Sequence, residues 1–218
     1  MSTKSKLLTD QATQELINQL KQKIGTGAYR PGEWLKQIDI ETTFNVNRFT
    51  VRSAFTELSS SGFLQHVPYK GYRVIEHSVQ ERIAITEARE LLESAVALKV
   101  MANIDDTGMQ QLQALAEGFR TAMEEEDRGQ MMKHNFAFHR TFYNYCNNHY
   151  LSSMIDEMRE RGVGSASQGW AKRSTIEVSC QDHFDMVSAL LERNVVRLQS
   201  LIHLHLNRWR EGYQDQQS

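Results

Sequence analysis

Two arginines stand one helical turn apart in the first third of the chain. Arg48 and Arg52 lie at i and i+4 in the stretch FNVNRFTVRSAFTELSSSGFL, residues 44–64. An arginine fork can donate to both O6 and N7 of a guanine, which gives about 1–3 kcal/mol of discrimination per good contact. Asn47 and Thr50 beside them can reach phosphates or bases. These residue types at this spacing can read DNA, although a merely solvated helix face is the more common explanation for an isolated pair of arginines.

Three histidines occupy apolar helix faces in the second part of the chain. His139 stands one turn after Asn135 in HNFAFHRTFYNYC, His183 lies in DHFDMVSALL, and His205 lies in LIHLHLNRW. A single inward histidine is typical of a core residue. Three on separate helices of one bundle favour a shared divalent cation, because one ion satisfies several buried imidazoles at once. The alternative is that the histidines bind water or a ligand directly. His203 shares its face with polar residues, so we expect it to be exposed.

The segment that must position the arginines reads as three helices and a hairpin. DQATQELINQLKQKIGTG predicts an amphipathic helix over residues 9–25, stopped by glycine. A second helix is expected within 34–44 and a third within 45–61. GFLQHVPYKGYRVIE alternates and turns, which predicts a small β-hairpin over 63–74. Three helices closed by a hairpin are the pattern of a winged helix-turn-helix.

The turn of the predicted hairpin carries a second basic cluster. Tyr69, Lys70 and Arg73 lie in and beside PYKG. A wing at this place would contact the neighbouring groove or the phosphate backbone.

The proline distribution divides the chain. Both prolines, Pro31 and Pro68, lie in the first third, and about 150 residues without proline follow. The expected fold class is therefore mainly α. We expect a winged helix-turn-helix DNA-binding domain over residues 1–76, and an all-α helical bundle of six or seven helices over 77–218.

The composition sets broad limits. The 218 residues are 40% hydrophobic and carry a net charge of -2, without an apolar run long enough for a membrane span or a secretory signal, so we expect a cytoplasmic protein with no membrane partner. Residues 1–76 hold ten lysines and arginines against seven acidic residues, or +3, and the remainder holds fifteen against twenty, or -5. The excess of basic residues in 1–76 weakly indicates that this part of the chain binds an anionic partner. Cys146 and Cys180 are expected to be buried free thiols.

The first part resembles the winged-helix domain of the GntR family of bacterial transcription regulators. The resemblance is carried by GAYRPGEWL, NRFTVRSAFTELSSSGFL and PYKGYRV, which follow one another with gaps of the right length. Phe49, Thr50 and Ser53 depart from the family pattern beside the two arginines, and Asn47 replaces the usual serine. Together with the residue chemistry, the resemblance gives the expected DNA-binding residues: Asn47, Arg48, Thr50, Arg52, Tyr69, Lys70 and Gly71.

The second part resembles the FCD-type ligand-binding domain of the FadR subfamily of GntR regulators. RELLE, NFAFH, DH and HL occur in the family order. In metal-binding members an acidic residue and three histidines hold the ion, so the resemblance implies a metal site at Asn135, His139, His183 and His205. Zn²⁺ fits three imidazoles, with Ni²⁺ and Mn²⁺ as alternatives. The uncharged Asn135 leaves the cation its full charge, which should weaken metal binding and favour an anionic effector.

The resemblance also implies that Arg89 faces the pocket and meets an effector carboxylate. The alternative is an exposed i,i+4 pair with Glu93, worth a few tenths of a kcal/mol. The function expected is that of a homodimeric repressor that binds a double-stranded DNA operator. A small carboxylate or sugar acid would control its operator affinity from the metal-containing pocket.

Two other functions are compatible with a histidine-bearing helical bundle. In a metal-sensing regulator, the ion itself would be the signal. A metal-dependent enzyme on a helical bundle would need a general base beside the histidines, and neither HExxH nor paired ExxH motifs are present. We therefore expect no enzymatic activity.

Overall fold

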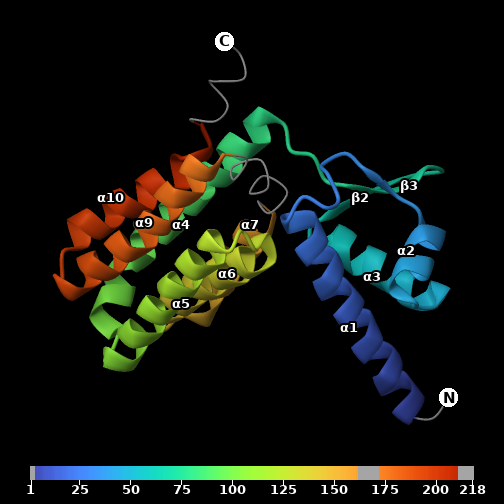
Figure 1. Ribbon diagram of the computed structural model, residues 1–218, viewed down its shortest axis with the longest axis horizontal. Helices are drawn as coiled ribbons and strands as arrows, with labels where there is room; N and C mark the ends of the chain where they lie inside the picture. The colour runs from blue at the N-terminus through green and yellow to red at the C-terminus, as the bar shows by residue number, and fades with distance from the viewer. Residues whose placement is uncertain (1–2, 162–171, 211–218) are drawn as a thin grey trace. The chain divides into compact units, whose positions relative to one another are not determined.

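The computed structural model describes residues 3–161 and 172–210, with side chains from residue 10 onward (Figure 1). The chain forms two compact units that divide between His77 and Ser78. The predicted domain boundary lies one residue earlier, after residue 76.

The first unit combines helices with a small antiparallel sheet. The sheet has the order β1-β3-β2, and β3 pairs with both neighbours. The elements are α1 (Thr3–Gly25), β1 (Trp34–Leu35), α2 (Gln37–Phe44), α3 (Arg48–Ser60), β2 (Leu64–Val67) and β3 (Gly71–Val74).

The core of the first unit forms between α1 and α3. Both helices carry apolar residues at spacings of three and four, and these stripes are fully buried. The buried residues are Leu16, Ile17, Leu20 and Ile24 on α1, and Val51, Ala54, Phe55 and Leu58 on α3. Packing on α1 leaves the opposite face of α3 in solvent.

Two details of this unit differ from the sequence predictions. Helix α1 begins at Thr3, six residues before the predicted Thr9, because no residue between them breaks a helix. Trp34 and Leu35 form strand β1 rather than the beginning of the second helix, and they pair with Arg73 and Tyr72. Hydrogen bonding to the distant strand β3 decides the conformation of Trp34 and Leu35, so the wing is a three-stranded sheet.

The turn between β2 and β3 spans three residues. Val67 pairs with Gly71 across it, and Lys70 N–H donates to the Val67 carbonyl at 3.0 Å. Tyr69 has φ 65° and Gly71 has φ 103°, both in the left-handed region. Gly71 adopts this conformation without strain because it has no Cβ.

The second unit is helical throughout its described residues. Its helices are α4 (Val79–Asn103), α5 (Asp106–Glu124), α6 (Arg128–Asn144), α7 (His149–Arg161), α9 (Arg173–Leu191) and α10 (Val195–Asn207). Helix α4 begins with a capping box, in which Ser78 accepts from Glu81 N–H and Glu81 accepts from Ser78 N–H.

The helices of the second unit pack around one main core. Helix α10 lies against α4 and α9, and α5 lies against α6 and α9 (Figure 1). Aromatic residues of α6, including Phe138, Phe142 and Tyr143, are fully buried at the centre. Cys146 and Cys180 are buried free thiols, as expected. None of the helices in the described ranges is long and apolar enough to cross a membrane.

Candidate DNA-reading surface and metal site

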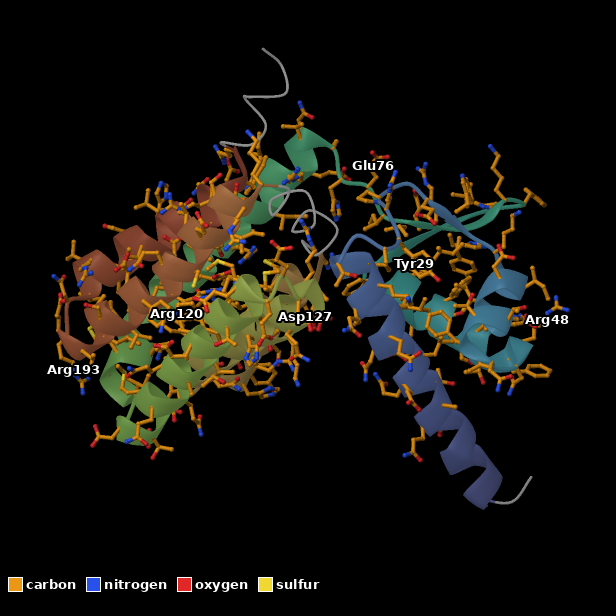
Figure 2. All side chains as sticks on the ribbon, in the orientation of Figure 1. Tyr29, Arg48, Glu76, Arg120, Asp127 and Arg193 are labelled. Carbon is orange, nitrogen blue, oxygen red and sulfur yellow. The ribbon has the colours of Figure 1, made fainter. Side chains whose placement is uncertain are left out.

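Arg48 and Arg52 lie on the solvent face of α3. Both are exposed, and neither side chain has a hydrogen bond or ion pair within residues 10–161 and 172–210. Figure 2 shows Arg48 pointing away from the helices. Phe49 is 75% exposed beside them. The two guanidinium groups are therefore available to a partner, while the other face of α3 is anchored in the core.

Asn47 and Thr50 have structural roles at the beginning of α3. The Asn47 side chain accepts from the N–H groups of Phe49 and Thr50 at 2.9 and 3.0 Å, so it caps the helix. Thr50 is 1% exposed, and its hydroxyl donates to Asn47 Oδ1 at 3.3 Å. The expected contact of the Thr50 side chain with DNA is revised, because this side chain lies on the buried face of α3.

The wing presents a second exposed group. Tyr69 is fully exposed, and Lys70 is exposed. The position that a Cβ would occupy on Gly71 is open, with no described atom close to it. Arg73 is engaged within the sheet, where its Nε donates to Gln65 Oε1 at 2.8 Å and its guanidinium lies 5.9 Å from the Trp34 ring centre. The residues of the turn, rather than Arg73, are free to contact a partner.

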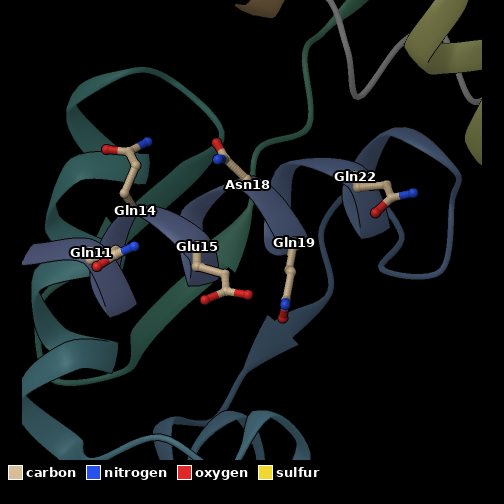
Figure 3. Close-up of a pocket in the computed structure, with 6 residues that line it drawn as sticks. All are labelled: Gln11, Gln14, Glu15, Asn18, Gln19 and Gln22. Carbon is tan, nitrogen blue, oxygen red and sulfur yellow. The ribbon is translucent and has the colours of Figure 1, made fainter. Parts of the chain in front are cut away.

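A hollow on the surface of α1 is lined by polar side chains of that helix alone (Figure 3). None of the predicted DNA, metal or effector residues lines it. The lining residues are Gln11, Gln14, Glu15, Asn18, Gln19 and Gln22.

The three predicted histidine ligands meet inside the second unit. One nitrogen of each lies within 4.8 Å of the others. The Nε2 atoms of His139 and His183 are 3.2 Å apart. Two nitrogens bound to one tetrahedral Zn²⁺ at 2.0–2.1 Å would lie about 3.3 Å apart. His139 and His183 are 1% and 0% exposed, and burial holds the pKa of each well below its usual value, with the Arg159 charge adding to the effect. Neutral imidazoles at this spacing can bind a divalent cation.

Asp182 orients the third histidine. His205 Nδ1 lies 3.0 Å from Asp182 Oδ2, which leaves Nε2 available to a cation. Arg208 donates to both oxygens of Asp182 at 3.0 and 2.8 Å. Burial raises the pKa of Asp182, but the hydrogen bonds from His205 and Arg208 outweigh it, so the pKa is lowered. No role is predicted for Asp182 from the sequence, although its position directly before His183 in the DH motif could have indicated a role at the histidine site.

Several buried polar atoms around the histidines have no hydrogen-bond partner within residues 10–161 and 172–210. They are Asn135 Oδ1, His139 Nδ1 and His183 Nδ1. A buried polar atom without a partner is costly, so an orphaned amide oxygen one turn before His139 is consistent with a ligand that satisfies it. The three imidazoles therefore fit a shared cation, and the amide oxygen of Asn135 stays a predicted fourth ligand.

Arg89 forms an i,i+4 pair with Glu93, in which Glu93 is buried and Arg89 is half-buried rather than exposed. Arg89 Nε donates to Glu93 Oε1 at 2.7 Å, and Glu93 is 1% exposed. Tyr143 donates its hydroxyl to Glu93, and Arg159 Nη1 lies 3.7 Å from Glu93 Oε2. Burial raises the pKa of Glu93, yet Arg89 and Arg159 outweigh it and hold the pKa below its usual value. The role of Arg89 toward an effector stays a prediction.

Two other histidines of the second unit, His203 and His134, lie outside this cluster. His203 is 54% exposed at its side chain and lies 2.6 Å from Glu90, as expected for a surface histidine. The His134 ring packs against Gly118, and its buried Nδ1 has no hydrogen-bond partner among the described residues. The absence of a side chain at Gly118 creates the space that the ring fills.

Comparison with known proteins agrees with this architecture. Residues 12–74 match the family described as "Bacterial regulatory proteins, gntR family", and residues 84–208 match the FCD domain. The chain is 26% identical over 200 residues to the HTH-type transcriptional repressor GlaR of Escherichia coli K12, covering 86% of this chain and 89% of GlaR. It is 23% identical over 198 residues to the repressor RspR of the same organism, covering 91% and 87%.

Solved structures show the same fold. The Escherichia coli protein McbR/YncC superposes with a TM-score of 0.81 at 21% identity, over 94% of this chain and 98% of that one. A GntR family regulator from Pseudomonas syringae superposes with a TM-score of 0.51 at 26% identity, over 95% of this chain and 86% of that one. These relatives are regulators of transcription rather than enzymes.

Proposed function

Because the chain belongs to the GntR family of bacterial regulatory proteins and carries an FCD domain, we propose that it is a homodimeric repressor controlled by a small organic acid or sugar acid. The acid would bind in a metal-containing pocket of the FCD domain, as the resemblance to metal-binding members of the FadR subfamily implies. A DNA partner requires a cytoplasmic location.

The exposed arginines of α3 carry the proposal for operator binding. Arg48 and Arg52 stand free on a helix whose opposite face is locked against α1, and whose first turn is capped by Asn47. A fixed helix that presents two unpaired guanidinium groups can read guanines in the major groove. Tyr69 and Lys70 of the wing would contact the neighbouring backbone or groove.

A gel shift with the DNA upstream of the gene and of its neighbours tests this assignment. Arg52→Ala should weaken specific binding by about 1–3 kcal/mol, or roughly 5- to 150-fold, because one bidentate contact is lost. Arg128→Ala is the matched control, since Arg128 is an exposed arginine at the beginning of α6 in the other unit. Equal binding by Arg52→Ala and the wild type would contradict the role of Arg52.

An apolar stripe on α4 supports the proposed homodimer. Ala84, Ala88, Leu91, Ala95 and Leu98 repeat at spacings of 4, 3, 4 and 3. Leu91 and Leu98 are 76% and 56% exposed. Heptad spacing suits pairing with the same stripe on a second copy, and a two-fold dimer matches two operator half-sites.

The oligomeric state tests the dimer directly. Leu91→Glu should give a monomer in size-exclusion chromatography with light scattering and should reduce operator affinity. Leu191→Glu is the control, because Leu191 is similarly exposed, at 67%, on α9. A dimer that persists in Leu91→Glu would exclude this surface.

The histidine cluster supports a resident cation. His139, His183 and His205 would supply imidazole nitrogens and Asn135 an amide oxygen. Zn²⁺ suits this donor set, and Ni²⁺ and Mn²⁺ are the alternatives. When bound, the cation would supply positive charge that attracts a carboxylate.

The charges near the cluster favour an anionic effector. Arg89 and Arg159 share the single carboxylate of Glu93, and Asp182 is bonded to His205 and Arg208. Calorimetry of the Zn²⁺-loaded protein should show binding of organic or sugar acids. Binding confined to neutral or cationic compounds would contradict the effector class.

Metal sensing is the second candidate, and the same three histidines support it. If Zn²⁺ alone changed operator affinity, with no further change when organic acids are added, the ion would be the signal. Control by an acid predicts instead that the acid releases the operator while Zn²⁺ stays bound.

A further inference from the structure

Arg159 is an arginine whose burial the architecture of the second unit does not explain. It lies on α7 with only 8% exposure, and its buried Nη1 has no hydrogen-bond partner in the part of the chain that the structure describes. Its ion-pair contact with Glu93 is 3.7 Å long, which exceeds a hydrogen bond. Burying an arginine without a paired anion costs free energy, so this guanidinium group is available to bind an anion.

Glu93 cannot serve as the full partner of Arg159. Its Oε1 accepts from Arg89 at 2.7 Å, and its Oε2 accepts from the Tyr143 hydroxyl. Two guanidinium groups therefore share one carboxylate, which leaves one positive charge in excess. Asp156, the other acid that acts on Arg159, is bonded to Arg140 at 3.1 Å.

The excess charge adjoins the histidine cluster. The Tyr143 ring, which donates to Glu93, is stacked with His139 at 6.3 Å between ring centres. Glu93, which Tyr143 contacts, in turn lies 3.7 Å from Arg159 Nη1. A contiguous set of contacts thus joins the three histidines to Arg159.

We propose that Arg159, rather than Arg89, is the primary anchor for an effector carboxylate, with Arg89 kept in place by Glu93. This inference rests on the proposed control by an organic acid and names the residue that selects it. Arg89 already donates to Glu93, whereas Arg159 Nη1 has a donor to spare. A carboxylate paired with Arg159 would neutralise the excess charge and satisfy that donor.

Titration calorimetry of the full-length Zn²⁺-loaded protein tests the assignment, with citrate, gluconate and lactate as probes. Arg159→Gln should weaken binding of the best probe by at least about tenfold, and Arg89→Gln should weaken it less. Arg120→Gln is the control, because Arg120 is an exposed arginine that pairs with Glu117. Unchanged binding in Arg159→Gln, or a larger loss in Arg89→Gln, would overturn the proposal.

A second variant covers the case in which Arg159→Gln fails to fold. Glu93→Gln removes the shared carboxylate, so the buried Arg159 and the half-buried Arg89 both lose this counterion. The best probe should raise the melting temperature of Glu93→Gln more than that of the wild type. An equal or smaller rise would contradict an anion site at Arg159, since a purely structural ion pair predicts no gain from a free carboxylate.

Failure of this inference can be told apart from failure of the proposed function. If the wild type binds a probe but Arg159→Gln binds it equally, only the anchor is wrong. If the wild type binds no carboxylate probe, both the anchor and the effector class are wrong. The gel shift with Arg52→Ala tests operator binding independently of both outcomes.

Discussion

Asp182→Asn should weaken metal binding although Asp182 is not a predicted ligand. The carboxylate is 2% exposed, lies 3.0 Å from His205 Nδ1 and accepts two hydrogen bonds from Arg208. This arrangement keeps the His205 proton on Nδ1 and leaves Nε2 as the free nitrogen. The substitution keeps the size of the side chain and changes only its charge and hydrogen-bonding pattern.

The asparagine cannot satisfy both neighbours. If its oxygen faces Arg208, its NH₂ group faces His205 Nδ1, and the imidazole proton moves to Nε2, where it blocks coordination. If its oxygen faces His205, its NH₂ group meets the Arg208 donors. Loss of such an orienting carboxylate typically lowers metal affinity 10- to 100-fold, which corresponds to about 1.4–2.7 kcal/mol.

Competition with a fluorescent chelator measures the Zn²⁺ affinity of each variant at pH 7.5. Asp185→Asn is the matched control, because Asp185 lies one turn further on α9, is 34% exposed, accepts from Gln181 at 3.2 Å and lies 3.7 Å from Arg197, without a hydrogen bond or ion pair to the described histidines. Zn²⁺ affinity of Asp182→Asn within twofold of the wild type would refute the argument. An equal loss in Asp185→Asn would show that any charge change on α9 has the same effect.

Three further predictions concern the metal site and helix α3. The Asn135→Asp variant should bind Zn²⁺ at least about tenfold more tightly and carboxylate probes more weakly, because the added negative charge stabilises the cation and reduces the positive potential that attracts a carboxylate. Chelator competition measures the Zn²⁺ affinity, and calorimetry measures the affinity for the carboxylate probes. Zn²⁺ removal by a chelator should lower the melting temperature by several degrees, since free Zn²⁺ at 100 times its Kd stabilises by about 2.7 kcal/mol; an unchanged melting curve would argue against a resident ion. Asn47→Ala should lower the free energy of unfolding by about 1 kcal/mol, because two N–H groups lose their cap; denaturant unfolding checks it, with the exposed Asn103→Ala as control.

The winged helix-turn-helix and the helical bundle could be predicted because their signals are local. Apolar residues at three- and four-residue spacing specified which face of α3 is buried, and the same rule put His139, His183 and His205 on inward faces. The glycine after α1 and the PYKG turn marked where elements end. Each signal depends on the period of one helix or strand, which a single sequence contains.

Strand β1 and the buried position of Thr50 could not be predicted in the same way. Trp34 and Leu35 form a strand only because β3 supplies pairing partners from the other end of the unit. Thr50 is a polar residue next to two exposed arginines, and only its packing inside the first unit decides that it faces inward.

The partners of the charged residues were also decided by the tertiary structure. Asp182 meets His205 across 23 residues of chain, and Tyr143 meets Glu93 across 50. The sequence by itself determined which faces of the helices are buried and which residues could bind DNA or metal. Only the packing of the helices decided that Arg89 and Arg159 share one carboxylate, because long-range pairing depends on the rotation and depth of each helix rather than on its own period.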